Sequence, residues 1–251
     1  MTSLPKDNFS TQSDLYVKYR PHYSSAVFNF ILQFVKTRQR ALDCGTGNGQ
    51  AAAVLSDHFE YVDATDISEK QIMNAIKKPN IFYHVCPADK TTFADSSFDL
   101  ITCATAIHWF SFDVFFNEMK RVAKNEAVFA CWAYDLIRTD NDEINKLIRT
   151  FYGTTVKQYW DAERSHVDHL YKTIPFPFRE IPNPGFSTVL TWDIDTLEGY
   201  LNTWSAVQHY IKKNNFNPVN DLIKTIRERT GNFAAIQATF PVFMRIGIID
   251  K

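Results

Sequence analysis

A set of glycines spaced two residues apart is the feature of the sequence best suited to holding a ligand. Gly45, Gly47 and Gly49 directly follow a short apolar run. Alternate glycines let a backbone approach a bound molecule closely and take dihedral angles that other residues avoid. Asp43 lies two residues before the first glycine. Its carboxylate would attract a cation, such as the α-ammonium group of an amino acid.

A second carboxylate, Asp66, ends the next apolar run, about twenty residues after Gly45. A carboxylate at this distance can accept hydrogen bonds from both hydroxyls of a ribose. The turn that binds dinucleotides has glycine or alanine at the sixth place of its motif, and Gln50 occupies that place here. The dinucleotide pattern is therefore not met. A nicotinamide-dependent oxidoreductase and a non-catalytic cofactor-binding module remain as alternatives.

Short apolar runs alternate with helical patterns between residues 40 and 133, which is typical of βαβ units and a parallel sheet. The expected strands are 41–45, 61–67, 81–86, 98–104 and 127–133. The carboxyl ends of parallel strands share one edge, where open α/β sheets bind ligands. The two aspartates should therefore lie at the same crevice.

Amphipathic stripes predict the helices that cover this sheet. Apolar residues from Phe112 to Ala123 recur at helical spacing, and another stripe at 27–35 precedes the first strand. Ser68 followed by Gln71 matches a capping box and marks the helix after the second strand. These helices should lie against the two faces of the sheet.

The pattern changes after Ala133, and residues 174–186 carry four prolines, so they should form no regular strand or helix. The expected order is an insertion at 134–185, a strand at 187–192, helices within 195–230 and a last strand at 240–248. We therefore expect one α/β domain over 1–251. Its doubly wound, mostly parallel seven-stranded sheet would carry the insertion as a cap after the fifth strand.

Composition limits the classes of partner. The formal charge of −1, from 27 basic and 28 acidic side chains, provides no excess of positive charge for binding the phosphate backbone of a nucleic acid. No apolar run is long enough for a spanning helix and no signal-peptide core is present, so we expect a cytoplasmic protein without a membrane partner. The cysteines lack metal-site or redox spacing and are expected to be buried thiols, and no metal is expected: Cys44, Cys86, Cys103 and Cys131. Monomer and homodimer both remain open.

The glycine turn with Asp43 resembles the signature turn of class I S-adenosylmethionine-dependent methyltransferases, and residues 87–100 are similar to that family's run after the third strand. The resemblance implies S-adenosylmethionine as cofactor, with the adenine beside Ala88 and Asp89. It also implies that residues 1–35 form a lid and a helix. The implied cofactor-binding residues are Tyr16, Tyr19, Arg20, Asp43, Gly45, Thr46, Gly47, Gly49, Asp66, Ile67, Ala88, Asp89 and Thr105.

Four short segments resemble a narrower branch, the small-molecule methyltransferases related to trans-aconitate methyltransferase. They are residues 19–21, 106–110, 159–160 and 203–206. The branch implies a small-molecule acceptor that is methylated on a carboxylate or hydroxyl oxygen. The implied substrate-binding residues are His108, Trp109, Trp132, Tyr159, Trp160, Arg164 and Trp204.

The two acceptor types imply different catalytic residues. A carboxylate needs no base, and Arg20 and Arg164 would hold it through forked, charge-assisted hydrogen bonds. A hydroxyl would need a base, for which His108 is the candidate. The sequence departs from the family at residues 123–127, where many members have a Pro-Gly-Gly turn. This departure leaves the register of the fifth strand open.

Overall fold

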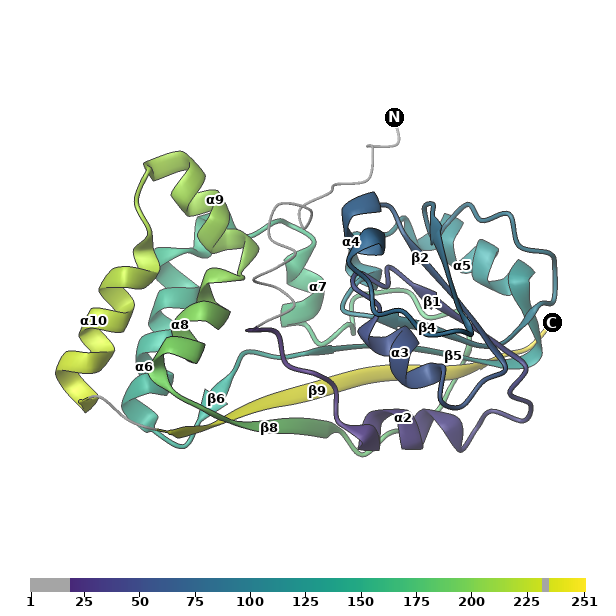
Figure 1. The fold of residues 1–251 in the computed structure, drawn as a ribbon, viewed down its shortest axis with the longest axis horizontal. Helices are drawn as coiled ribbons and strands as arrows, with labels where there is room; N and C mark the ends of the chain where they lie inside the picture. Colours follow the sequence, from purple (N-terminus) through teal and green to yellow (C-terminus); the bar gives the residue numbers. More distant parts are fainter. Residues whose placement is uncertain (1–18, 232–234) are drawn as a thin grey trace.

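Parallel strands form the centre of one sheet in the computed structural model, which describes residues 19–231 and 235–251 (Figure 1). The described strands are β1 Arg40–Cys44, β2 Tyr61–Asp66, β3 Ile81–Val85, β4 Phe98–Ala104, β5 Ala123–Tyr134, β6 Arg138–Thr139, β7 Arg179–Glu180, β8 Phe186–Trp192 and β9 Ile236–Ile249. They run in the order β3-β2-β1-β4-β5-β9, with β6, β7 and β8 also paired to β9. The doubly wound α/β fold is thus confirmed, with two two-residue strands added to the expected seven.

The described helices follow the expected stripes and continue beyond them. They are α2 Ser25–Leu32, α3 Gln50–Leu55, α4 Glu69–Met73, α5 Phe112–Val122, α6 Asp142–Thr150, α7 Arg164–Asp168, α8 Ile194–Asn202, α9 Ser205–Asn214 and α10 Pro218–Thr230. Short helical turns are η2 Ile107–Trp109, the π-helical η3 Phe151–Thr155 and η4 Lys157–Tyr159. The Ser68 hydroxyl accepts from the backbone N–H of Gln71, as the capping box predicts. None of the described helices is long and apolar enough to cross a membrane.

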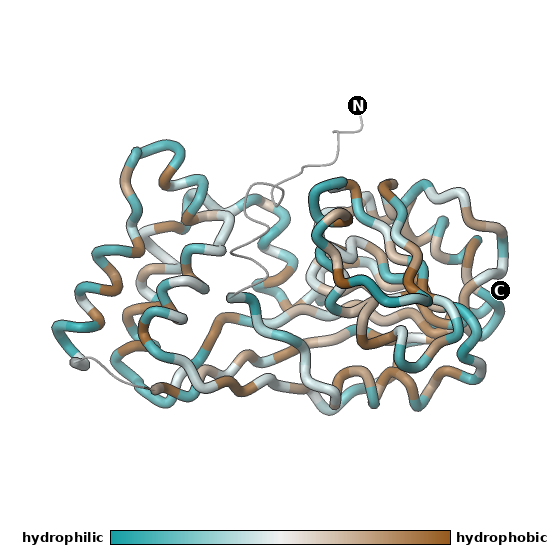
Figure 2. Tube along the Cα trace, in the orientation of Figure 1, coloured by the Kyte–Doolittle hydropathy of each residue, from teal (hydrophilic) through white to brown (hydrophobic). Residues whose placement is uncertain are grey.

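Both faces of the central sheet are buried, which explains why its strands are continuous apolar runs. Along β5, Val128 and Ala130 join the hydrophobic cluster that contains α2 and α3. Phe129 and Cys131 join the cluster that contains α5. Successive side chains of a strand point to opposite faces, so one strand serves both clusters. Figure 2 shows the hydrophobic residues along these strands.

The start of β5 settles the register question. Phe98 pairs with Ala123 and Leu100 with Val128, so extra residues of β5 bulge from the ladder between these pairs. Glu126 lies within the bulge and takes a positive φ of 62°. The bulge therefore occupies the place of the missing Pro-Gly-Gly turn.

A group of helices lies beside the far end of the sheet (Figure 1). Helix α10 contacts α6, α8 and α9, so the group combines a helix that precedes β8 in the sequence with helices that follow it. Strand β9 connects the two regions, because it pairs with β8 over residues 236–242 and with β5 over 242–249. The prediction that 174–186 hold no regular strand is wrong at β7, where Arg179 and Glu180 pair with β9.

Candidate functional site

A cavity of about 380 Å³ opens at the carboxyl edge of the sheet, and we call it the large cavity. The strand order reverses between β1 and β4, which is the point where open α/β sheets bind ligands. Eight of the residues expected to bind the cofactor line it: Gly45, Thr46, Gly47, Asp66, Ile67, Ala88, Asp89 and Thr105. The structure therefore brings together segments that follow four different strands.

The three glycines of the first loop have different surroundings, although all take positive φ. A Cβ added to Gly45 would lie 2.6 Å from Cβ of Ala106, and one added to Gly49 would lie 2.2 Å from Oη of Tyr83. A Cβ on Gly47 would meet no atom of the described chain within 4 Å. Gly47 thus faces open space, whereas Gly45 and Gly49 allow close packing. Gly49 does not line the cavity and instead caps the N-terminus of α3.

Asp66 lies in the wall of the large cavity and is fixed by two backbone groups. Its Oδ2 accepts from the N–H of Gly47 at 2.8 Å, and its Oδ1 accepts from the N–H of Ser68 at 2.9 Å. A carboxylate oxygen has more than one lone pair, so both oxygens can accept further hydrogen bonds. The geometry suits a ligand with neighbouring hydroxyl groups.

Asp43 lies beneath the loop rather than in the cavity. Its side chain is 1% exposed, and its oxygens accept from the hydroxyls of Thr46 at 2.6 Å and Thr102 at 2.8 Å. Burial raises the pKa of Asp43 to about 6, against the opposing effect of these hydrogen bonds. Asp43 therefore orders the loop directly, and a cation above the loop would favour its charged form.

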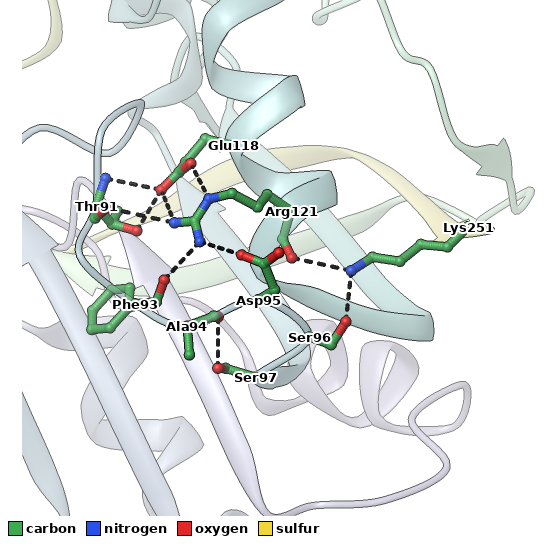
Figure 3. A network of polar contacts seen from close by, with 9 residues as sticks. All are labelled: Thr91, Phe93, Ala94, Asp95, Ser96, Ser97, Glu118, Arg121 and Lys251. Carbon is green, nitrogen blue, oxygen red and sulfur yellow. Dashed lines mark hydrogen bonds and ion pairs between the residues drawn. The ribbon is translucent and has the colours of Figure 1, made fainter.

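The loop after β3 is attached to α5 by a polar network (Figure 3). Glu118 accepts from the backbone N–H and hydroxyl of Thr91, at 2.9 and 2.6 Å. Arg121 pairs with Glu118 at 2.7 Å and donates to the carbonyl of Phe93 and the carboxylate of Asp95, at 2.8 and 2.7 Å. The loop also supplies Ala88 and Asp89 to the cavity, so α5 holds one cavity wall in place.

A second cavity of about 50 Å³, the small cavity, lies between the sheet edge and the helical group. Residues from several distant segments line it: Arg20, Thr105, His108, Trp109, Tyr134, Leu136, Trp160, Asp161, Arg164, Tyr200, Trp204 and Ser205. Thr105, His108 and Trp109 line both cavities. The two cavities therefore meet at η2 and the residues just before it.

Arg164 is held against aromatic rings in the small cavity. Its guanidinium lies 4.9 Å from the ring centroid of Trp160, and its Nε donates to the hydroxyl of Tyr152 at 3.1 Å. The terminal nitrogens of Arg164 make no hydrogen bond to the described residues. The buried indole N–H of Trp160 also has no acceptor among these residues. The guanidinium of Arg164 and the indole of Trp160 thus both have N–H groups available to a ligand.

Arg20 also lines the small cavity and is anchored by two hydrogen bonds. It donates to the hydroxyl of Tyr134 and to the carbonyl of Thr203, the latter at 3.0 Å. Tyr19 lines neither cavity, since its ring lies against Gly199 of α8. Tyr16 falls outside the described residues.

Two of the aromatic residues expected at the substrate lie elsewhere. Trp132 is fully buried, with its ring against those of Tyr23 and Phe28. Tyr159 stacks near Tyr210 on α9. Neither Trp132 nor Tyr159 lines the large or the small cavity, whereas Trp109, Trp160 and Trp204 each line at least one of them.

His108 lies where the cavities meet and is 5% exposed. Its Nδ1 is 3.0 Å from the hydroxyl of Tyr171. Burial, together with the charges of Arg164 and His166, lowers the pKa of His108 to about 3. The imidazole is therefore neutral and weakly basic.

Two glutamines in the large cavity were not expected from the sequence. The amide nitrogen of Gln50 and the amide oxygen of Gln71 are buried without a hydrogen-bond partner in the described chain. Their polar type at the starts of α3 and α4 is the signal that could have identified them. Cys86 also lines this cavity and is only half-buried, unlike the other three cysteines. The described residues contain no cluster that could hold a metal ion.

Comparison with known proteins assigns this architecture to a family. Residues 42–131 match the model of a methyltransferase domain. A Dictyostelium discoideum protein described as a methyltransferase is 31% identical over 95% of this chain and 93% of its own length. A Saccharomyces cerevisiae protein described as S-adenosylmethionine-dependent is 30% identical over 53% of this chain and 48% of its own length.

Solved structures agree with these relatives. A protein from Anaeromyxobacter dehalogenans, described as a type II methyltransferase, superposes with a TM-score of 0.84 at 36% identity. The match covers 92% of this chain and 99% of that one. It therefore includes the helical group as well as the sheet. The chain belongs to the class I S-adenosylmethionine-dependent methyltransferases.

Proposed function

We propose that the enzyme methylates an oxygen atom of a small molecule bound in the small cavity, with S-adenosylmethionine in the large cavity. The observation that carries this proposal is the meeting of the two cavities at Thr105, His108 and Trp109. A methyl group leaving one cavity would arrive at an acceptor in the other. A carboxylate is the acceptor that the small cavity suits best.

The large cavity offers groups that match each part of the cofactor. Asp66 would accept from the ribose hydroxyls, and Asp89 from the adenine amino group. Asp43 would attract the ammonium group through the loop that it orders. Gln50 and Gln71 would supply further hydrogen bonds from amide atoms that have no partner among the described residues.

The bound cofactor supplies a methyl group already activated on a sulfonium. The residues of the chain then have to orient the acceptor and exclude water, which can lower a barrier by ~7–11 kcal/mol. The helical group covers the small cavity and would serve as the cap. This arrangement supports the expected cap at 134–185, extended by α8 and α9.

The small cavity favours an anion. Arg20 and Arg164 contribute two positive charges and Asp161 one negative charge, so its lining is cationic. The indole N–H of Trp160 and the terminal nitrogens of Arg164 are donors without protein acceptors in the described structure. A carboxylate would satisfy these donors through charge-assisted hydrogen bonds.

The lowered pKa of His108 argues against the alternative role of this residue as a base. A general base works best when its pKa is near the operating pH, and a value of about 3 is far below it. A carboxylate oxygen needs no deprotonation near neutral pH. The carboxylate acceptor therefore takes precedence over a hydroxyl, in line with the resemblance to the trans-aconitate methyltransferase-like branch.

A product screen tests the proposal. Purified protein is incubated with S-adenosylmethionine and separate panels of small carboxylic acids, phenols and lipidic alcohols, and S-adenosylhomocysteine is measured. We expect turnover with carboxylic acids. Turnover confined to hydroxyl compounds would contradict the carboxylate acceptor, and no turnover with any class would favour the non-catalytic alternative. The nicotinamide alternative no longer applies, because the chain belongs to the methyltransferases.

Variants of Arg164 then locate the acceptor. Arg164→Gln removes the charge, and we expect the acceptor KM to rise about 10–100-fold, because a hydrogen bond to a charged group contributes ~1.5–3 kcal/mol. The affinity for S-adenosylmethionine should stay within about twofold. The control is Arg227→Gln on α10, whose exposed pair with Asp195 lies outside both cavities. An unchanged acceptor KM in Arg164→Gln would exclude this residue from acceptor binding.

A further inference from the structure

We propose that Tyr171 is a positioning residue that fixes the tautomer of His108, so that His108 presents an Nε2–H to the acceptor. This inference rests on the proposed function only in taking the methyl acceptor as the ligand that contacts His108. The tautomer itself is a property of the chain. His108 would then donate a hydrogen bond to a lone pair of the acceptor and could not remove a proton.

The phenol of Tyr171 determines the direction of its hydrogen bond. Tyr171 is fully buried, and its hydroxyl contacts Nδ1 of His108 at 3.0 Å. Nδ1 is the one hydrogen-bond partner that the described residues give this hydroxyl. A buried donor without an acceptor is costly, and the phenol proton has nowhere else to go. The phenol therefore donates to Nδ1, and the single proton of the neutral imidazole lies on Nε2.

The surroundings keep both groups in the required protonation states. Burial raises the pKa of Tyr171 well above its ordinary value, so the phenol retains its proton. Burial and the charges of Arg164 and His166 lower the pKa of His108, so the ring stays neutral. Nε2 makes no hydrogen bond to the described residues, and His108 lines both cavities. Nε2 is thus the ring nitrogen left for a ligand.

The backbone around Tyr171 is held in an unfavourable conformation. Leu170 and Tyr171 have φ of 53° and 60°, a region that residues other than glycine rarely adopt. The N–H of Tyr171 donates to the carbonyl of His166 at 2.8 Å. Arg245 of β9 donates to the carbonyls of Tyr171 and Ile174, at 3.3 and 2.6 Å. Such strain persists where surrounding contacts enforce it and often marks functional positions.

Nitrogen NMR of the holoenzyme tests the tautomer directly. Histidine is labelled with ¹⁵N, and the signals of His108 are assigned by their loss in His108→Gln. We expect Nε2 to carry the proton and Nδ1 to carry none in the wild-type protein. A proton on Nδ1 would overturn the inference, whether or not the protein transfers a methyl group. Absence of cofactor binding would instead overturn the proposed function and leave the tautomer result unaffected.

Kinetics of Tyr171→Phe separate positioning from packing, because the substitution removes only the hydroxyl. We expect kcat to fall about 10–100-fold, as when a partner of an active-site group is removed, while the affinity for S-adenosylmethionine stays within about twofold. The signals of His108 should shift toward a mixture of tautomers. Tyr210 lines neither cavity, so Tyr210→Phe is the control and should leave kcat unchanged. Wild-type kcat and an unaltered tautomer in Tyr171→Phe would contradict the proposal.

Discussion

The backbone nitrogen of Gly47 and the carboxylate of Asp66 are 2.8 Å apart, which joins the loop after β1 to the end of β2. One side chain thereby shapes the cavity wall and remains able to accept from a ligand. Binding and loop order are coupled at this position, so its substitution should affect both.

Asp66→Asn removes the charge and one acceptor atom. We expect the Kd for S-adenosylmethionine to rise about 10–100-fold, since each charge-assisted hydrogen bond contributes ~1.5–3 kcal/mol. Isothermal titration of the purified variant measures this change. Asp57→Asn, which alters an exposed pair with Lys78, is the matched control and should bind normally. An unaltered Kd in Asp66→Asn would exclude the ribose contact.

Asp43→Asn should change the pH dependence of stability. The folded state raises the pKa of Asp43 from 3.8 to about 6, so it binds this proton more tightly than the unfolded chain. The resulting stabilisation is present below about pH 4 and is lost as the pH rises through 6. The variant carries no buried charge and avoids this loss, which amounts to at most ~3 kcal/mol.

Thermal melts at several pH values test this expectation for Asp43→Asn. The Tm difference, variant minus wild type, should be more positive at pH 8 than at pH 4, while cofactor affinity falls at both. Asp57→Asn again serves as control. A Tm difference that does not vary with pH would show that ionisation of the buried Asp43 carboxyl does not destabilise the folded protein.

Arg121→Ala should loosen the loop after β3. The substitution removes the bonds to Phe93, Asp95 and Glu118, and we expect the Kd for S-adenosylmethionine to rise about 10-fold, or ~1.4 kcal/mol. Arg121→Lys keeps the charge but not the forked geometry and should have an intermediate effect. Hydrogen exchange of residues 87–97, measured beside the affinities, reports the order of the loop. Unchanged exchange in Arg121→Ala would contradict this role of α5.

Glu126→Gly should stabilise the protein. Glu126 takes a φ of 62° in the bulge of β5, where a residue with a side chain costs ~1–2 kcal/mol more than glycine. The exposed pair with Lys36 that is lost contributes ~0–1 kcal/mol. We expect a Tm increase of about 2–4 °C. Glu126→Ala loses the same ion pair but keeps the strain of the positive φ, so it should show no increase in Tm. Equal Tm values for the two variants would contradict this explanation.

Local patterns predicted the fold where they repeat at a fixed period. The alternating runs located β1 to β5 within a few residues, because strands buried on both faces are continuous apolar segments. The bulge at Glu126 and the strand β7 were not predictable from composition. The first replaces a missing turn, and the second depends on pairing of Arg179 and Glu180 with β9, far along the chain.

The site was predicted best where a motif follows a strand directly. Gly47 and Asp66 lie in the cavity because β1 and β2 end at the same edge. The single aromatic residues were harder to place. Trp132 is on β5, and alternation along that strand turns it toward α2 and into the core. In the sequence, Gln50 stands out only as a departure from the dinucleotide motif, although its side chain lines the large cavity.

The length of β9 determines how the enzyme should respond to denaturants. One continuous strand of fourteen residues carries the ladder to β8 beside the helical group and the ladder to β5 in the central sheet. Because both ladders run along one continuous strand, loss of either ladder frees one end of the strand that holds the other, so the two regions should unfold cooperatively. Chemical unfolding should accordingly give a single transition, in which tryptophan fluorescence and far-ultraviolet circular dichroism change together.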